Sequence, residues 1–282
     1  MTVELRGKVV VVTGASSGIG ETTARAFARA GSVVVLAARG EDDLKRVTAS
    51  IQEHGGQASW FRCDVTSVED IDALRDHVEA THGRCDVLVN NAGIPGGGWF
   101  EGQDAGGIDA VVQTNLSGVI QCTRAFLPLL IDARGHVVNV GSLAGRYAVP
   151  GAAVYTATKH AVIAFSEALY HELRPKGVMV TSVNPGLVAT RGFPQTEVSR
   201  DPMLRRFVMA PERVAGAILH AVRQRKGPEW SVPRWLAAGQ AARILAPPLY
   251  RRALGRIVRR GRGAPTSSPD LVPRRRSITW KR

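Results

Sequence analysis

Cysteine is scarce in this sequence of 282 residues, and this scarcity excludes several protein classes. The three cysteines, at positions 63, 85 and 122, are scattered and form no CxxC pair. Because a disulfide framework uses an even and regularly spaced set, we expect reduced thiols in a reducing compartment. The seven histidines form no HExxH or similar ligand pattern, so we expect no metal site.

Long apolar runs are absent as well. The sequence contains no stretch of about eighteen apolar residues, the length that a membrane-spanning helix needs. Residues 1–8 are of mixed polarity and lack the apolar run of a signal peptide. A hydrophobic content of 44% and a charged content of 22% are ordinary for a globular protein. We therefore expect a cytoplasmic protein of one large domain or two small ones.

Acidic residues are rare near the C-terminus. Residues 243–282 hold twelve of the 37 basic residues and only one of the 24 acidic residues, Asp270. This segment therefore carries +11 of the net charge of +13, and residues 1–242 carry +2. The body of the chain is nearly neutral, and the basic character belongs to the segment at its end.

A glycine-rich turn follows the first expected strand. The run KVVVVT at 8–13 is β-branched, GASSGIG follows, and a helix-compatible stretch ends at Gly31. Small residues let the backbone approach a pyrophosphate, and the start of a helix offers free N–H groups and a partial positive charge. A tight turn without a ligand is the alternative. The expected phosphate-binding residues are Gly14, Ser16, Ser17, Gly18, Ile19 and Gly20.

The next expected strand, at 32–39, ends in Ala38-Arg39, with no acidic residue before Glu41. An acidic residue at this point would bind the ribose 2′-hydroxyl of NAD, whereas an arginine can bind the 2′-phosphate of NADP. We therefore predict NADP(H) rather than NAD(H) as the cofactor. The alternative is that Arg39 is simply solvated at the start of a loop.

Strands and helices alternate along the rest of the chain, which predicts a parallel sheet with helices on both faces. Polar or small residues end several strands, and the expected cofactor contacts Asp64, Val65, Asn91, Ala92 and Gly93 follow two of them. Asp64 could accept a hydrogen bond from an adenine amino group. We predict helices at 42–54, 68–82, 107–130 and 211–224. Asn115 lies inside the third, where a buried amide is disfavoured unless it has partners.

Tyr155 and Lys159 lie four residues apart in a run without glycine or proline, so they would be neighbours on one face of a helix. An ammonium beside a phenol lowers the phenol pKa from about 10 towards neutrality, which would let Tyr155 exchange a proton near pH 7. The strand before this helix ends at Ser142. Taken alone, the pair could merely stabilise an exposed helix face.

Residues 8 to about 233 closely resemble the short-chain dehydrogenase/reductase family. The matching elements are TGASSGIG at 13–20, CDV at 63–65, NNAG at 90–93, Asn115, Ser142, YxxxK at 155–159, and NPG at 184–186 followed by Thr190. The resemblance implies a single α/β, doubly wound parallel sheet of about seven strands, Rossmann-like in its topology. It also implies oxidoreductase activity on a carbonyl or secondary alcohol.

The resemblance implies a catalytic tetrad of Asn115, Ser142, Tyr155 and Lys159. Tyr155 would exchange a proton with the substrate oxygen, and Ser142 would hydrogen-bond the same oxygen. Lys159 would lower the pKa of Tyr155 and hold the nicotinamide ribose, and Asn115 would hold a water molecule. Contacts with the nicotinamide end of the cofactor would come from Pro185, Gly186, Val188 and Thr190 in addition to Tyr155 and Lys159.

One position departs from the pattern of NADP-preferring relatives. They often carry a basic residue just before the second glycine of the loop, and Ser17 stands there. The prediction of NADP(H) therefore depends on Arg39. Trp99 and Phe100 could line a substrate pocket or cover the core, and residues 187–210 are expected to form a lid. The lid and the loop that carries Trp99 and Phe100 suggest a largely apolar ketone or alcohol as the substrate.

The expected boundaries are 1–233 for the catalytic domain, 234–260 for a helical extension and 261–282 for a disordered basic tail. Leu249, Leu254, Ile257 and Val258 can share one face of the extension, which favours contact with an anionic membrane. Packing on the same subunit, or on the partner in a homodimer or homotetramer, is the alternative. A catalytically silent dinucleotide-binding regulator and a nucleic-acid binder are competing functions, and nucleic acid is disfavoured because Trp280 is the tail's only aromatic residue.

Overall fold

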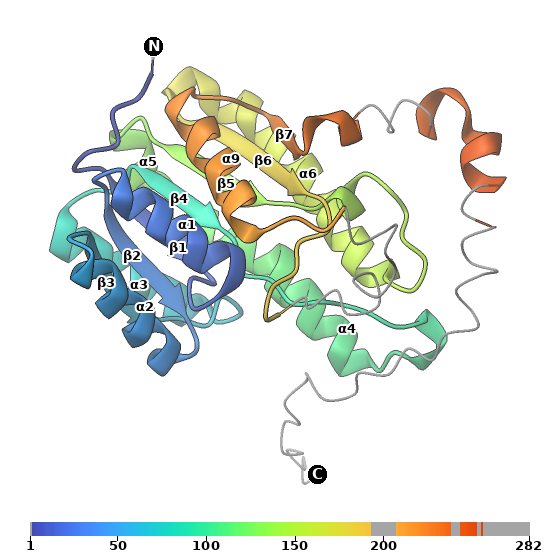
Figure 1. The fold of residues 1–282 in the computed structure, drawn as a ribbon, viewed down its shortest axis with the longest axis horizontal. Coiled ribbons are helices and arrows are strands. Elements are labelled where there is room, and N and C mark those ends of the chain that lie inside the picture. The colour runs from blue at the N-terminus through green and yellow to red at the C-terminus, as the bar shows by residue number, and fades with distance from the viewer. Residues whose placement is uncertain (1, 193–206, 238–242, 253–254, 256–282) are drawn as a thin grey trace, which may run out of the picture.

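The computed structural model describes residues 2–192, 207–237, 243–252 and 255. Its centre is a fully parallel sheet of seven strands in the order β3-β2-β1-β4-β5-β6-β7. The prediction of a doubly wound sheet with about seven strands is confirmed (Figure 1). The strands are β1 (Val9–Thr13), β2 (Val33–Ala38), β3 (Gln57–Arg62), β4 (Val87–Asn90), β5 (His136–Val140), β6 (Met179–Pro185) and β7 (Glu229–Val232).

Helices cover both faces of the sheet (Figure 1). One face packs against α1 (Gly18–Arg29), α2 (Glu41–Glu53) and α9 (Pro211–Arg223). The other packs against α3 (Val68–His82), α5 (Gly118–Asp132) and the C-terminal part of α6 (Ala153–Leu173). The chain changes its direction of winding between β1 and β4, which are neighbours in the sheet. Open α/β sheets bind ligands outside the carboxyl ends of the strands at such a point.

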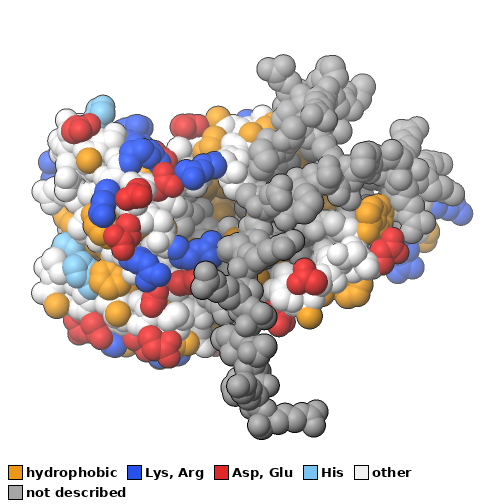
Figure 2. Space-filling view, turned by 90° about the horizontal axis from the view of Figure 1, so that it is seen from below, with side chains coloured by type: hydrophobic (Ala, Val, Ile, Leu, Met, Phe, Trp, Pro, Cys, Tyr) orange, Lys and Arg blue, Asp and Glu red, His pale blue; other side chains and the backbone are white. Residues whose placement is uncertain are grey.

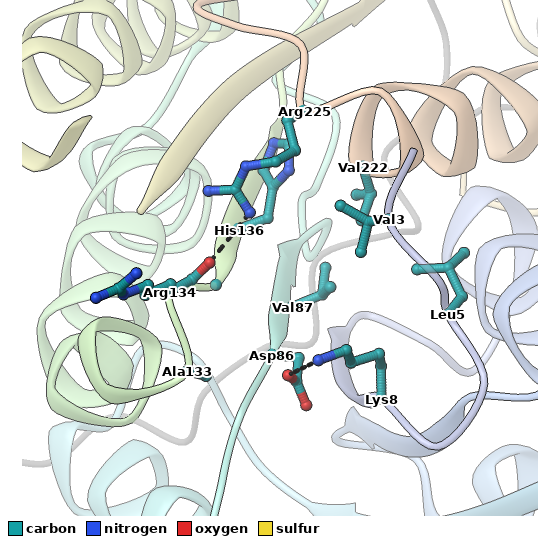
Figure 3. Close-up of a pocket in the computed structure, with 11 residues that line it drawn as sticks. Val3, Leu5, Lys8, Asp86, Val87, Ala133, Arg134, His136, Val222 and Arg225 are labelled. Carbon is teal, nitrogen blue, oxygen red and sulfur yellow. Dashed lines mark hydrogen bonds and ion pairs between the residues drawn. The ribbon is translucent and has the colours of Figure 1, made fainter. Parts of the chain in front are cut away.

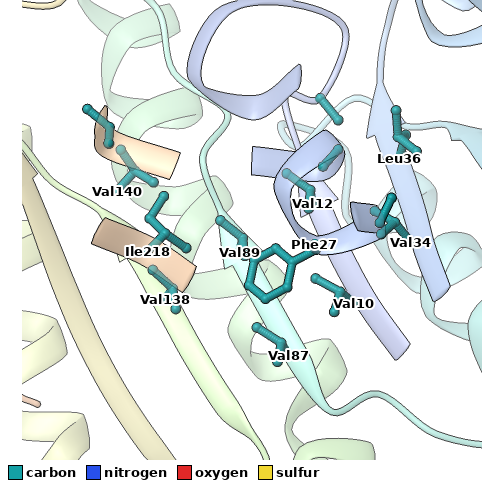
Figure 4. Packing of buried hydrophobic residues seen from close by; sticks show 14 of the residues in the cluster. Val10, Val12, Phe27, Val34, Leu36, Val87, Val89, Val138, Val140 and Ile218 are labelled. Atoms are coloured by element: carbon teal, nitrogen blue, oxygen red, sulfur yellow. The ribbon is translucent and has the colours of Figure 1, made fainter. Parts of the chain in front are cut away.

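The valine-rich first strand explains why both faces are covered. Val10 and Val12 point into the core that contains Phe27 of α1 (Figure 4), whereas Val9 and Val11 belong to the opposite core with Phe126 of α5. Successive side chains of a strand point to opposite faces, so a strand with apolar residues on both faces needs helices on both sides.

The surface of the described body carries charges of both signs. Figure 2 shows basic and acidic side chains interspersed over its visible part, in keeping with the near neutrality of residues 1–242.

The single helix predicted at 107–130 is wrong in its middle. The structure has α4 (Ala105–Val112), a π-helical turn η2 (Gln113–Ser117) and then α5. Asn115 lies in the π turn, where its side chain accepts a hydrogen bond from Ile94 N at 2.8 Å and donates one to Ile94 O at 2.9 Å. The turn thus supplies the partners that a buried amide needs, and π turns often occur at functional sites.

Short 3-10 turns interrupt the loops at η1 (Phe100–Gly102), η3 (Leu143–Gly145), η4 (Arg174–Lys176) and η5 (Arg234–Ala237). Within the expected lid, Val188 pairs with Met209, and residues 193–206 lie outside the described residues. In the extension, residues 243–245 and 247–252 are helical, whereas Leu254, Ile257, Val258 and the tail at 261–282 lie outside the described residues. The division into 1–233, 234–260 and 261–282 stays a prediction. None of the described helices has the length and apolar character to cross a membrane.

Candidate active site

The glycine-rich loop joins β1 to α1 and can approach other backbone closely. Gly14 and Gly18 have φ values of +63° and +57°, which favour glycine. A Cβ atom at Gly20 would clash with Gly14 O and lie 2.5 Å from Asn91 Nδ2. The Ser17 side chain makes no capping hydrogen bond to α1, so the N–H groups of the first turn remain suited to an anionic ligand.

The end of β4 is hydrogen-bonded to this loop. Thr13 Oγ1 accepts hydrogen bonds from Asn91 N at 3.0 Å and Ala92 N at 3.1 Å. Asn91 Nδ2 donates to Thr13 O at 3.0 Å and Gly14 O at 3.2 Å. The structure therefore brings together the predicted residues of two strand ends that are far apart in the sequence.

The chain after β6 lies against the same loop. A Cβ atom at Gly18 would be 2.9 Å from Thr190 Cβ. Gly186 N donates to Val232 O at 2.9 Å, which fixes the chain just after Pro185 to the end of β7. Val188 is buried beside Met209. Of the residues predicted to contact the nicotinamide end, Thr190 therefore borders the glycine-rich loop, whereas Gly186 is bonded to β7 and Val188 pairs with Met209.

Asn115 and Lys159 are both deeply buried and lie on either side of Gly93. A Cβ atom at Gly93 would be 3.3 Å from Asn115 Oδ1 and 3.8 Å from Lys159 Nζ. Lys159 Nζ donates a hydrogen bond to Val140 O, the last residue of β5, at 2.9 Å. Burial lowers the pKa of Lys159 to about 8. The lysine can therefore exchange a proton close to neutral pH.

Tyr155 and Ser142 meet beside this lysine. Burial raises the pKa of Tyr155, and a hydrogen bond with Ser142 acts in the opposite direction. Lys159 Nζ lies 5.7 Å from the centroid of the Tyr155 ring. The lowered pKa that the sequence predicts for Tyr155 is therefore wrong for this structure, because burial raises the pKa by more than the hydrogen bond with Ser142 lowers it. Ser142 Oγ also accepts from Ala144 N at 3.1 Å.

Arg39 and Asp64 lie at the ends of the neighbouring strands β2 and β3. Arg39 is exposed and has no ion pair with the described residues. Asp64 Oδ1 accepts hydrogen bonds from Thr66 N at 3.0 Å and Thr66 Oγ1 at 2.8 Å. Val65 is buried and packs against Gly118 of α5, where a Cβ atom would be 2.8 Å from Val65 O.

The sequence analysis missed a group of charged side chains around Asp43 of α2. Asp43 pairs with Arg46 at 3.4 Å and with Arg191, just after Thr190, at 2.9 Å. Arg46 Nη2 also donates to Ser16 O at 3.2 Å and pairs with Glu21 at 3.2 Å. Asp43 and Arg46 lie on α2, whose sequence indicates only a solvated face, and their partners Glu21 and Arg191 come from other elements, so no signal in the sequence identifies the group.

Buried amides also support the site, and the sequence analysis did not use them. Asn90 Nδ2 donates to Asn139 Oδ1 at 2.8 Å, and Asn139 Nδ2 donates to Ser166 Oγ of α6 at 2.9 Å. The sequence does contain a signal for these bonds, because Asn90 and Asn139 stand in otherwise apolar strands, and a buried asparagine needs a hydrogen-bond partner. This chain of bonds joins β4, β5 and the helix that carries Tyr155 and Lys159.

A cavity of about 210 Å³ lies at the opposite edge of the sheet (Figure 3). It is lined at the amino ends of β1, β4 and β5 by residues that include Leu5, Asp86, His136 and Arg225, and it contains none of the predicted site residues. Among the described residues no group of three histidine, cysteine or acidic side chains is placed to hold a metal ion.

The family model described as short chain dehydrogenase matches residues 8–200. Probable oxidoreductase EphD of Mycobacterium tuberculosis is 36% identical over 267 residues, covering 89% of this chain and 45% of that protein. The chain thus spans less than half the length of this relative. A putative ketoacyl reductase of Streptomyces coelicolor is 43% identical over 187 residues, covering 65% of this chain and 71% of that protein.

Two solved structures share the fold. A short chain dehydrogenase/reductase from Burkholderia phymatum in complex with NAD superposes with a TM-score of 0.78 and 29% identity, over 88% of this chain and 96% of that one. A variant of actinorhodin polyketide ketoreductase with NADPH gives a TM-score of 0.73 and 33% identity, over 82% and 97%. The chain therefore belongs to the short-chain dehydrogenase/reductase family of oxidoreductases.

Proposed function

We propose that the protein is an NADP(H)-dependent oxidoreductase that interconverts a carbonyl compound and a secondary alcohol, with Tyr155 as the general acid and base. The observation that carries this proposal is the meeting of three groups. The Tyr155 phenol is hydrogen-bonded to Ser142, and both lie beside the buried Lys159 at the carboxyl end of β5. The names of the relatives, oxidoreductase and ketoacyl reductase, agree with this chemistry.

The residues at the strand ends suit a dinucleotide. The glycine-rich loop allows close backbone approach, and the first turn of α1 offers N–H groups to a pyrophosphate. Arg39 stands where a 2′-phosphate would need a positive charge, and its guanidinium is exposed. Relatives of known structure were solved with NAD and with NADPH, so the preference for NADP(H) rests on Arg39. When bound, the nicotinamide supplies or accepts the hydride.

In the direction of reduction, Tyr155 gives its phenolic proton to the carbonyl oxygen, and a phenolate remains. Burial keeps the Tyr155 phenol protonated, and the hydrogen bond with Ser142, which acts to lower the pKa of Tyr155, favours release of the proton. Ser142 donates a hydrogen bond to the same substrate oxygen. Lys159, whose pKa burial lowers to about 8, can return a proton to the phenolate. Asn115 is proposed to hold a water molecule that connects Lys159 with solvent.

The substrate is proposed to be a small lipophilic ketone or alcohol. Residues 94–102 approach Tyr155 at Gly96, where a Cβ atom would be 3.4 Å from Tyr155 Cβ. This loop carries the half-buried Trp99 and the exposed Phe100, which would offer apolar surface to a substrate. Assembly as a homodimer or homotetramer and a cytoplasmic location complete the proposal.

Turnover of Tyr155→Phe tests the proposal. NADPH oxidation is measured against a panel of ketones, and NADPH binding is measured separately by fluorescence. Loss of the proton donor should reduce kcat by about 10² to 10⁴-fold while NADPH affinity stays nearly constant. Tyr170→Phe, on the same helix but paired with Arg174, is the matched control and should retain activity. A kcat like that of the wild type in Tyr155→Phe would refute the mechanism.

A further inference from the structure

We propose that residues 243–252 of the extension form a docking surface for an anionic lipid bilayer, and that this surface is attached to the segment between Ser142 and Tyr155. The extension touches that segment at two points. Tyr250 Oη accepts a hydrogen bond from Ala148 N at 3.1 Å, and its ring lies 6.5 Å from that of Tyr147. Surface binding would therefore occur beside the proposed catalytic residues.

Arg243 makes the second attachment. Its Nη1 atom donates to Arg146 O and lies 2.9 Å from His160 Nε2 of α6. Arg146 is itself paired with Glu229 of β7, and Asn184 Nδ2 donates to Glu229 Oε1 at 2.9 Å. Arg243 is thus bonded to groups that continue into the sheet.

The described part of the extension presents large apolar side chains to solvent. Ile244 is 74% exposed, Leu245 82%, Leu249 66% and, in η5, Trp235 60%. Figure 1 shows the helical part of the extension (red) at the edge of the molecule, away from the sheet. Grouped apolar side chains with this exposure mark an interaction surface rather than ordinary scattered surface residues.

Charge selects the occupant of this surface. Arg251 and Arg252 follow the apolar residues and are exposed, and residues 243–282 together carry +11. A second copy of this chain would bring the same charge, so a contact between two extensions would be opposed by repulsion. An anionic bilayer attracts the arginines and also takes up the apolar side chains, as it does for basic amphipathic helices.

The docking surface gives the proposed function a source of substrate. A lipophilic ketone concentrates in the bilayer, and the extension holds residues 146–148 beside it, so the substrate need not cross bulk water. This consequence rests on the proposed function. The docking itself does not, because it concerns only the extension and the lipid.

Vesicle flotation of the full chain tests the docking. The probes are vesicles of phosphatidylcholine with phosphatidylglycerol, and vesicles of phosphatidylcholine alone, at low and high salt. We expect binding to the anionic vesicles, loss of most of it at high salt and weak binding to the neutral ones. Each basic residue at such a surface raises affinity about five-fold, so Arg251→Gln with Arg252→Gln should weaken binding by an order of magnitude or more.

The apolar contribution is tested with Ile244→Ser, Leu245→Ser and Leu249→Ser combined, which should also lower binding at least about ten-fold. Val68→Ser is the matched apolar control, because Val68 is 40% exposed on α3, and Arg6→Gln with Arg29→Gln is the matched charge control. Circular dichroism verifies that each variant is folded.

Equal binding by the extension variants and the wild type would overturn the proposal. A full chain that does not bind anionic vesicles would overturn it as well. If the triple substitution then dissociated a dimer, the apolar surface would instead be a contact with a second copy of the chain. Since no cofactor or turnover enters the assay, an inactive enzyme that binds vesicles would refute only the proposed function.

Discussion

Replacement of Lys159 by methionine should stabilise the protein at neutral pH while it abolishes activity. Burial lowers the pKa of Lys159 from its ordinary 10.5 to about 8. Below pH 8 the lysine is charged in both the folded and the unfolded chain, and the folded chain bears the full cost of desolvation. Between pH 8 and 10.5 the unfolded chain binds more protons, so the free energy of unfolding rises with pH.

The size of the effect follows from the shift. A pKa lowered from 10.5 to about 8, at roughly 1.4 kcal/mol per pKa unit, corresponds to about 3–4 kcal/mol of unfavourable desolvation at pH 7. Methionine fills similar volume without a charge, but it cannot donate to Val140 O, and that lost bond costs about 1–3 kcal/mol. Lys159→Met should therefore be more stable than the wild type by about 1 kcal/mol at pH 7. Near pH 10.5 the order should reverse, because the wild type has lost its desolvation cost.

Urea unfolding of both proteins from pH 6.5 to 10.5 measures this difference, and groups that titrate equally in both cancel. Lys45→Met is the control, since Lys45 is an exposed helix residue paired with Glu41, and its difference from the wild type should vary little with pH. A Lys159→Met variant less stable than the wild type at pH 7, with a difference that stays constant up to pH 10.5, would refute the reasoning.

Three further outcomes are expected. Asp43→Asn removes the carboxylate that pairs with Arg46 and Arg191 near the glycine loop, so both arginines become available to a 2′-phosphate. The ratio of kcat/KM for NADPH to that for NADH should rise about three- to ten-fold. An unchanged ratio would show that neither arginine contacts the cofactor. Arg39→Asp should reverse the preference towards NADH, and a wild type that already prefers NADH would contradict the choice of NADP(H). Burial raises the pKa of all three cysteines, that of Cys63 to about 12, so a thiol reagent at pH 8 should label them only after denaturation.

Local signals located some elements closely. The helix predicted at 68–82 matches α3, because Ser67 Oγ accepts a hydrogen bond from Asp70 N at 3.0 Å and Gly83 ends the helix with φ of +65°. Apolar strands followed by polar residues likewise identified the carboxyl edge of the sheet. Helix caps and strand ends are determined by residues that are adjacent in the chain, so the sequence alone is enough to predict them.

Features that depend on distant contacts were not predictable in the same way. The π turn at Asn115 exists together with its bonds to Ile94, and helical periodicity alone gives no sign of it. The direction of the Tyr155 pKa shift depends on how deeply the phenol is buried. The spacing of Tyr155 and Lys159 in the sequence gives no measure of that burial. The pairing of Asp43 with Arg191 joins residues from separate elements for the same reason.

That ion pair between Asp43 and Arg191 connects the chain after β6 to α2 near the glycine loop, because Arg46, the other partner of Asp43, donates to Ser16 O and Thr190 lies against Gly18. A molecule bound along the loop would lie beside this ion pair, and the pair would have to break before the molecule could dissociate. Arg191 is 73% exposed, so dissolved ions weaken the pair. Salt would then shorten the residence time of a bound dinucleotide in two ways, because it weakens this ion pair and also the attraction between the protein and the dinucleotide phosphates. Ionic strength would in this way set the rate of cofactor exchange.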